Sequence, residues 1–132
     1  MRACNFRMDK VFIILGGINA GLAVALGAFG AHGLKRVLTP EWLTVYQTGV
    51  HYHLIHALGL LCVGMIAQKF TPSWWLNGAG YCLLMGIILF SGSLYALSLS
   101  ELRFLGMITP LGGLSFLFGW GFLVTATLKE PH

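Results

Sequence analysis

The charged residues of this chain stand in short clusters, and long apolar tracts separate the clusters from one another. The chain has 132 residues, of which 57% are hydrophobic and only 9% are charged. Soluble domains average roughly 25% charged residues. Exclusion of charge from long apolar stretches is the distribution expected of membrane-spanning helices. We therefore expect a chain that folds in a membrane rather than a water-soluble globular domain.

Four apolar tracts cover residues 11–31, 46–67, 75–97 and 107–127. Each is close to the ~20 residues that an α-helix needs to cross a hydrocarbon core of ~30 Å. The short connections between the tracts favour antiparallel neighbours. The sequence thus predicts an all-α, polytopic membrane protein, with an antiparallel bundle of four transmembrane helices as a single domain over residues 1–132. Residues 1–7 become an alternative N-terminal extension if translation starts at Met8.

Thr-Pro pairs at 39–40, 71–72 and 109–110 punctuate the chain near the predicted helix starts. Each pair places a capping hydroxyl just before a proline at the first helical position. Two alternatives stay open here. Residues 41–44 either begin the second helix or form a loop, and the third pair either caps the fourth helix or kinks a longer one.

Basic residues give the expected orientation. The side of the two termini carries Arg2, Arg7, Lys10, Lys69 and Lys129, and the other side carries Lys35, Arg36 and Arg103. The positive-inside rule then places both termini in the cytoplasm. A start at Met8 would remove this bias. The basic start and the small residues at 23–25 also fit a cleaved signal peptide, but the apolar run continues to Ala31 and is long enough to span.

Small residues crowd the predicted helices. The first tract contains a Gly17-xxx-Gly21 spacing, and the third places Gly78, Cys82 and Gly86 at four-residue steps. Small residues let membrane helices approach closely, which is how such helices associate without a hydrophobic driving force. We expect a tight bundle, with self-association through a small face that is left uncovered.

Three histidines fall within six residues of the second tract, in the stretch "GVHYHLIHALGLL". If this helix enters the membrane near Tyr46, then His51 lies about 8 Å deep, His53 about 10 Å and His56 about 15 Å. Asn19 of the first tract lies roughly 13 Å from the opposite face, near the level of His56. The depths therefore predict that Asn19 pairs with His56.

These depths define two candidate polar layers. The central layer holds Asn19 and His56, with His53 as a further candidate. The outer layer holds His51, Ser91, Ser93 and Thr109. Neutral histidines that hydrogen-bond across helices would fix their register, which is the leading interpretation. The alternative is a proton or small-solute path lined by these groups, because ionisable residues inside a membrane are functional-site candidates.

A third interpretation, a metal or haem site, has less support. His53 and His56 lie on one helix, whereas haem needs axial ligands from facing helices. Cys4, Cys62 and Cys82 form no CxxC pair and read as small packing residues. We expect no metal, no cofactor and no catalytic residue. Nothing resembles a nucleophile with its base, a phosphate-binding loop or a nucleic-acid surface, so we expect neither enzyme activity nor a nucleic-acid partner.

Four motifs occur in order along the chain: "GGINAGLAVALGAFGAHGLK", "YQTGVHYHLIHALGLL", "LFSGSLYALSL" and "ITPLGGLSFLFGWGFL". Together they resemble the membrane-protein family of unknown function number 423, which includes bacterial YgdD and YwdK and eukaryotic transmembrane protein 256. The similarity covers nearly the whole chain from Met8 onward. The family's motif positions fall here on His32, Tyr52, His53, His56, Ala57, Thr109, Pro110, Gly112 and Gly113.

The resemblance implies a four-helix integral membrane protein, located in bacteria in the cytoplasmic membrane. It implies no established activity. We therefore expect a structural, assembly or accessory component of the membrane. Its partners would be the lipid bilayer and either further copies of itself or a larger membrane complex, with a small channel or transporter as the alternative.

Overall fold

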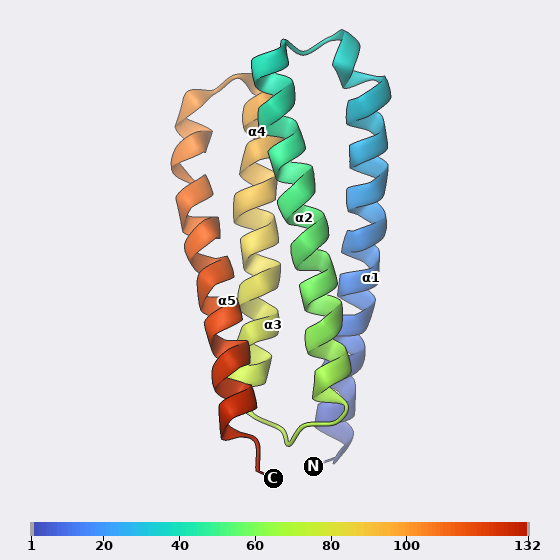
Figure 1. The fold of residues 1–132 in the computed structure, drawn as a ribbon, viewed down its shortest axis with the longest axis vertical. Coiled ribbons are helices and arrows are strands. Elements are labelled where there is room, and N and C mark those ends of the chain that lie inside the picture. Colours follow the sequence, from blue (N-terminus) through green and yellow to red (C-terminus); the bar gives the residue numbers. More distant parts are fainter. Residues whose placement is uncertain (1, 132) are drawn as a thin grey trace.

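The protein is a bundle of four antiparallel helical rods, seen in a computed structural model that describes residues 2–131, with side chains from Met8 to Pro131 (Figure 1). The first rod is α1 (Arg2–His32) and the second is α2 (Pro40–Ala67). The third rod joins α3 (Trp74–Gly86), the π-helical turn η2 (Ile87–Ser91) and α4 (Gly92–Ser100). The fourth rod is α5 (Thr109–Lys129). Short 3-10 turns η1 (Leu34–Arg36) and η3 (Arg103–Met107) precede α2 and α5.

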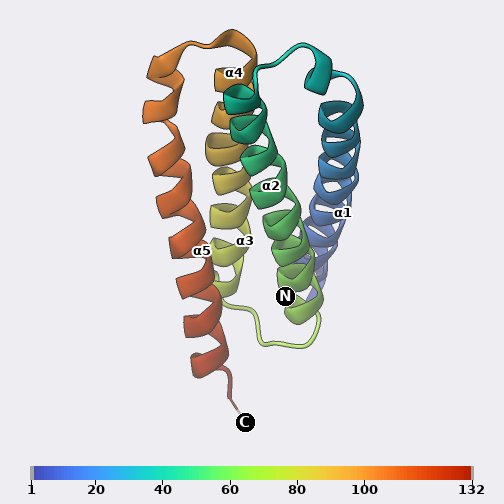
Figure 2. The same cartoon turned by 45° about the horizontal axis from the view of Figure 1, so that its top comes forward.

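The rods are long and apolar enough to cross a membrane. Four candidate spans of 27 to 29 residues cover Met8–Arg36, Pro40–Ala67, Trp74–Ser100 and Arg103–Lys129, and each contains one of the four apolar tracts. The start of α1 and the end of α5 lie at the same end of the bundle, beside the α2–α3 connection (Figures 1 and 2). The predicted fold class, an all-helical bundle of four transmembrane-length helices, is confirmed.

Of the three Thr-Pro pairs, the first caps its helix as expected, and the other two do not. The second helix does begin at Pro40, and the Thr39 hydroxyl accepts a hydrogen bond from the Trp42 amide at 3.4 Å. The prediction of a cap at Thr71 is wrong, since Ser73 caps α3. The Thr71 amide and hydroxyl instead donate to the Glu130 carboxylate at 2.8 and 2.9 Å, which ties the α2–α3 connection to the end of α5.

Thr109 is also not a cap, although α5 begins there with Pro110 in its first turn. The Thr109 hydroxyl lies 2.6 Å from the Ser93 hydroxyl of α4. Proline therefore starts this helix rather than kinking a longer one, because its missing N–H and fixed φ are compatible with the first turn.

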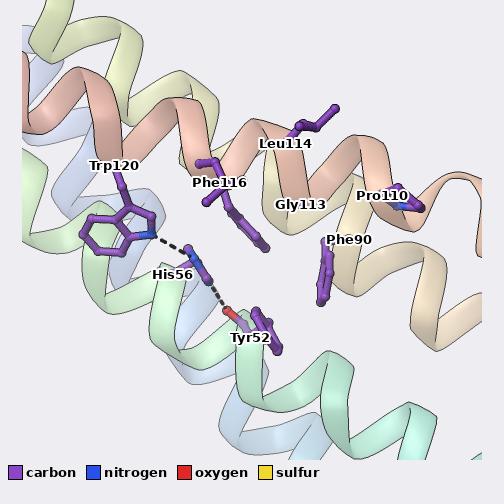
Figure 3. A pocket seen from close by; sticks show the side chains of 9 residues that line it. Tyr52, His56, Phe90, Pro110, Gly113, Leu114, Phe116 and Trp120 are labelled. Atoms are coloured by element: carbon purple, nitrogen blue, oxygen red, sulfur yellow. Dashed lines mark hydrogen bonds between the residues drawn. The ribbon is translucent and has the colours of Figure 1, made fainter.

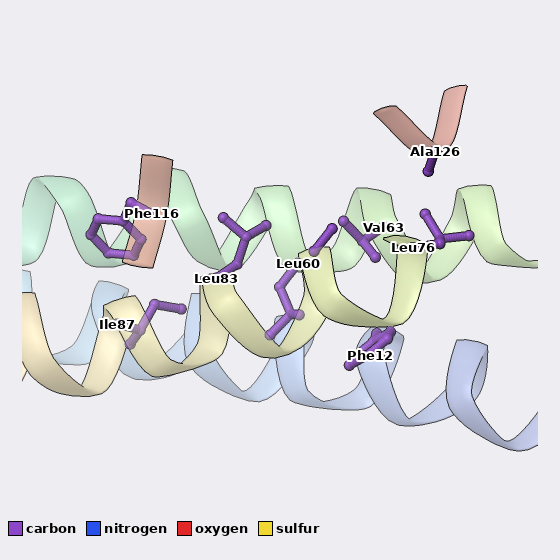
Figure 4. Packing of buried hydrophobic residues seen from close by; sticks show 9 residues of the cluster. Phe12, Leu60, Val63, Leu76, Leu83, Ile87, Phe116 and Ala126 are labelled. Carbon is purple, nitrogen blue, oxygen red and sulfur yellow. The ribbon is translucent and has the colours of Figure 1, made fainter. Parts of the chain in front are cut away.

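Two helices form the centre of the bundle, and two lie at its flanks. α2 packs against the third rod, α1 packs mainly along α2, and α5 packs mainly along α3 and η2. Buried apolar side chains from all four rods meet in one cluster, which includes Phe12, Leu60, Leu83, Ile87 and Phe116 (Figure 4). A helix at the centre can present different faces to different neighbours, and α2 does so.

Glycines set the closest approaches between rods. A Cβ on Gly16 would lie 2.6 Å from the backbone nitrogen of Leu61, and one on Gly64 would lie 2.8 Å from the Asp9 carbonyl oxygen. These two positions hold α1 against α2. Gly17 and Gly21, whose spacing suggested a helix interface, face outward, since a Cβ on either would meet nothing within 4 Å.

Candidate functional site

The polar centre of the bundle is built on α2, which carries His53 and His56 three residues apart. Their side chains are only 3% and 5% exposed. Three residues rotate a helix by about 300°, so the two Cα positions are roughly 60° apart around the axis. Because α2 is central, this angle is enough to send His53 to Asn19 of α1 and Tyr95 of α4, and His56 to Trp120 of α5.

The His53 junction is a chain of polar groups. His53 Nε2 lies 3.0 Å from Asn19 Oδ1, and His53 Nδ1 lies 2.9 Å from the Tyr95 hydroxyl. The Asn19 amide nitrogen donates to the Leu15 carbonyl at 2.8 Å, which fixes Oδ1 as the atom facing His53. An amide oxygen only accepts, so Nε2 carries the proton and Nδ1 accepts from Tyr95.

The His56 junction is aromatic. The Trp120 indole N–H donates to His56 Nε2 at 3.1 Å, and His56 Nδ1 lies 2.8 Å from the Tyr52 carbonyl oxygen (Figure 3). The imidazole also stacks on the Phe116 ring with 3.5 Å between ring centroids and 11° between planes. An indole only donates and a carbonyl only accepts, so here Nδ1 carries the proton and Nε2 accepts.

The two imidazoles are therefore held as opposite neutral tautomers. Each uses both ring nitrogens, one as donor and one as acceptor, which is the full capacity of a neutral imidazole. Buried polar groups inside a membrane are costly unless they are hydrogen-bonded. At His53 the neighbouring helices α1 and α4 meet this requirement, and at His56 the α2 backbone and Trp120 of α5 meet it.

The predicted pair of Asn19 and His56 is wrong. Asn19 binds His53, and both nitrogens of His56 are engaged by Tyr52 and Trp120. Depth along the helix axis placed Asn19 near the correct level, but His53 and His56 are only about 4.5 Å apart along that axis. Their difference in direction around the helix decided the partner.

The predicted outer layer divides into three separate places. Ser93 and Thr109 contact each other and join α4 to α5. Ser91 donates to the Gly49 carbonyl of α2 at 2.8 Å and is fully buried. His51 is exposed on the outer face of α2, and its ring contacts only Tyr52 among the described aromatic residues.

A groove of about 620 Å³ opens between α2 and α5 beside His56 (Figure 3). Aromatic side chains line it, among them Tyr52, Phe90, Phe116 and Trp120. The Tyr52 and Phe90 rings pack with centroids 4.6 Å apart. Phe90 belongs to the π-helical turn, a form of backbone that is rare and often found near functional sites. The groove is a concave apolar surface, and the polar groups among its lining residues belong to the His56 junction and to the Tyr52 side chain.

The motif residues gather mostly at this groove. Tyr52, His56, Pro110 and Gly113 line it. Gly112 lies directly behind it, where a Cβ would contact the Phe90 backbone. His32 is apart from the site, since its Nδ1 lies 2.9 Å from the Ala28 carbonyl at the end of α1. The remaining polar motif positions, His53 and Thr109, belong to the contacts with α1 and α4.

Sequence reasoning missed Tyr95, Phe116 and Trp120 as partners of the histidines. A buried Tyr or Trp usually finds a hydrogen-bond partner for its O–H or N–H, so the position of Tyr95 and Trp120 within apolar tracts was the available signal. Nothing distinguished Phe116 from other apolar residues. Among the described residues, no group of three or more His, Cys, Asp or Glu side chains could hold a metal ion.

Comparison with known proteins places the chain among membrane proteins. Residues 26–113 match the family "Protein of unknown function (DUF423)". The chain is 52% identical over 120 residues to the "UPF0382 membrane protein YwdK" of Bacillus subtilis, covering 91% of this chain and 98% of that protein. It is 51% identical over 120 residues to the "UPF0382 membrane protein SERP0230" of Staphylococcus epidermidis, covering 91% and 97%. No solved structure matches the chain.

Proposed function

We propose, from the premise that this chain belongs to the DUF423 family of membrane proteins, that it is a non-enzymatic structural or accessory component of the membrane. In this role its intramembrane histidines hold the four rods in register, and the assembled bundle serves as a building block for itself or for a larger membrane complex. We place it in the bacterial cytoplasmic membrane with both termini in the cytoplasm, as the distribution of basic residues favours.

The observation that carries this proposal is the closed hydrogen bonding of His53 and His56. All four ring nitrogens are paired with protein groups at 2.8 to 3.1 Å. A nitrogen that already holds a protein partner must lose it before it can bind a ligand. The pairing therefore favours a packing role over a haem or metal site.

The strongest rival is a proton path through Tyr95, His53 and Asn19. The order of donors in this chain argues against it. The Asn19 amide nitrogen donates its hydrogen bond to the Leu15 backbone carbonyl. A backbone carbonyl carries no proton to hand on, so the chain stops there.

Proton flux in proteoliposomes separates the two functions. Purified protein is reconstituted with a trapped pH-sensitive dye, and a potassium diffusion potential drives protons. We expect the same flux as in empty vesicles. A flux that the wild-type protein supports, and that Tyr95→Phe abolishes while the helix content is kept, would replace the structural role with a proton path.

An absorption spectrum of the same preparation tests the alternative that the histidines bind haem. We expect no Soret band after purification from cells supplied with haem. A stoichiometric Soret band that disappears in His56→Phe would instead establish a haem ligand and contradict the proposal.

A further inference from the structure

The outer face of α2 forms a regular ridge along the whole helix. The exposed residues of this ridge are Thr44, Gln47, His51, Ile55, Leu58, Cys62 and Met65. They recur at steps of three or four residues, which is the spacing of a seam between two packed helices. The half that begins at Thr44 is polar, and the half from Ile55 onward is apolar.

Two polar side chains of the ridge have no hydrogen-bond partner within residues 8–131. The Thr44 and Thr48 hydroxyls each donate to the backbone carbonyl four residues earlier, at 2.9 Å. The Gln47 amide and the His51 imidazole make no such bond, although they are neighbours on one face of the helix. The ridge therefore presents unused donors and acceptors outward.

His51 lies about 8 Å inside the point near Tyr46 where α2 is expected to enter the membrane, and Gln47 lies about one helical turn nearer to the interface. His51 follows Glu41 by ten residues, about 15 Å along the helix axis. A polar group without a partner costs several kcal/mol in hydrocarbon. Polar residues of transmembrane helices almost always face another helix or a water-filled cavity. The polar half of the ridge is thus a surface that favours a polar partner.

We infer that this partner is a second copy of the chain, with the two α2 helices parallel about a two-fold axis normal to the membrane. Such an axis brings each residue of the ridge against its own counterpart. The Gln47 amide and the His51 imidazole can then each bond to the same group of the second copy, because an amide and a neutral imidazole each hold a donor and an acceptor. Interhelical bonds of this kind are an established means of helix association in membranes.

The shape of the ridge fits the same partner. A hollow of about 280 Å³ lies in the polar half, lined by Thr44, Gln47, Thr48, His51 and Tyr52. It offers room for a side chain from the second copy beside the two unpaired groups. In the other half, Ile55, Leu58 and Met65 supply the apolar contacts of the seam. The inference deepens the proposed accessory role, on which it rests, by naming the first partner.

Oxidative crosslinking in membranes tests the pairing, since Cys62 already lies on the ridge and is exposed. In a background with Cys4→Ser and Cys82→Ser, we expect Cys62 to form a disulfide-linked dimer. With Cys62→Ser added, we expect Ile55→Cys to form one as well. Leu117→Cys, exposed on α5 rather than on the ridge, is the matched control and should remain monomeric.

The pattern of crosslinks also reports the direction of the two helices. Ile55 is midway in sequence between Glu41 and Lys69, near the two ends of α2. An antiparallel pair would therefore join Ile55→Cys but not Cys62, and would overturn the parallel arrangement. Absence of crosslinks at both ridge positions, or equal crosslinking at Leu117→Cys, would overturn the interface itself.

The double variant Gln47→Leu with His51→Leu tests the polar half. We expect its dimer dissociation constant, measured by energy transfer between labelled copies in vesicles, to rise about tenfold, since two pairs of interhelical bonds are lost. The unfolding midpoint of the monomer in detergent should not fall, because neither residue has a partner within the described chain. An unchanged dissociation constant would overturn the proposed pairing. Proton flux into the same vesicles tests the proposed structural role separately from the dimer.

Discussion

The two histidine junctions of α2 use the same side chain in different ways. His53 is enclosed between two helices and bonds only to polar side chains, Asn19 and Tyr95. His56 bonds to a backbone carbonyl and an indole, stacks on a phenyl ring, and borders an open groove. The difference shows that the neighbours of a buried imidazole, rather than the imidazole itself, decide its tautomer and its exposure to ligands.

The largest effect is expected at the enclosed junction. His53→Leu leaves the Asn19 oxygen and the Tyr95 hydroxyl unpaired, and we expect the free energy of unfolding to fall by about 2 to 3 kcal/mol. SDS-driven unfolding in mixed micelles measures it. His51→Leu is the matched control on the same helix and should change the monomer's stability little. Equal losses for both variants would contradict the assigned roles.

Near the groove, α5 packs closely against the backbone of η2. Substitution of two adjacent glycines, Gly112 and Gly113, tests this contact. A Cβ on Gly112 would collide with the Phe90 backbone, whereas one on Gly113 would be no closer than 3.8 Å to the Phe90 ring. We expect Gly112→Ala to destabilise the protein by about 1 to 3 kcal/mol. Gly113→Ala should be neutral or slightly stabilising, since alanine favours helix. The same unfolding assay measures both, and a reversed order would contradict the packing of α5 on η2.

A smaller loss is expected at His56. His56→Phe keeps an aromatic ring against Phe116 but leaves the Trp120 N–H without its acceptor. We expect the free energy of unfolding to fall by about 1 kcal/mol, less than for His53→Leu, because the aromatic stacking is retained. A loss at least as large as that of His53→Leu would remove the distinction between the two junctions.

Double-mutant cycles test which histidine Asn19 contacts. Asn19→Leu and His53→Leu should be non-additive by at least about 0.5 kcal/mol, because residues in contact couple. Asn19→Leu and His56→Leu should be additive within about 0.5 kcal/mol. Coupling to His56 alone would restore the pair that depth along the helix predicted.

The tautomers can be observed without any change in stability. In protein with ¹⁵N-labelled histidine in lipid nanodiscs, the ring nitrogen shifts should report Nε2–H at His53 and Nδ1–H at His56. Trp120→Phe should release the constraint on His56 and leave the His53 signals unchanged. The same tautomer at both residues would contradict the hydrogen bonding of the two junctions.

The division of the chain into four rods could be predicted from the sequence. Charge is excluded from hydrocarbon, so each span is visible as a long uncharged tract along the chain. The start of α2 at Pro40 was also within reach, since Thr39 and Pro40 form a local cap. The cap of α3 was missed because Thr71 has a more distant partner, Glu130. Local signals predicted local structure, and failed where a residue bonded across the bundle.

The candidate site could be predicted in its members but not in its pairings. Asn19, His53 and His56 stand out as polar residues in apolar tracts, and depth brought them to one level. Gly16 and Gly64 make the close contacts of α1 with α2. Gly17 and Gly21 lie on a face of α1 that the bundle leaves open, so self-association through that face stays a prediction. Spacing along one helix fixes how residues share a face, but not which neighbour that face meets.

By itself the sequence determined that this protein lies in a membrane as four antiparallel helices, because the hydrocarbon core imposes length and apolarity on every span. Only the tertiary structure decided which helix each face of α2 meets. That choice placed the two histidines in separate junctions with opposite tautomers, and it left Gln47 and His51 facing outward. The physical reason is that hydrogen bonds and close glycine contacts depend on rotation about each helix axis, which depth and composition do not record.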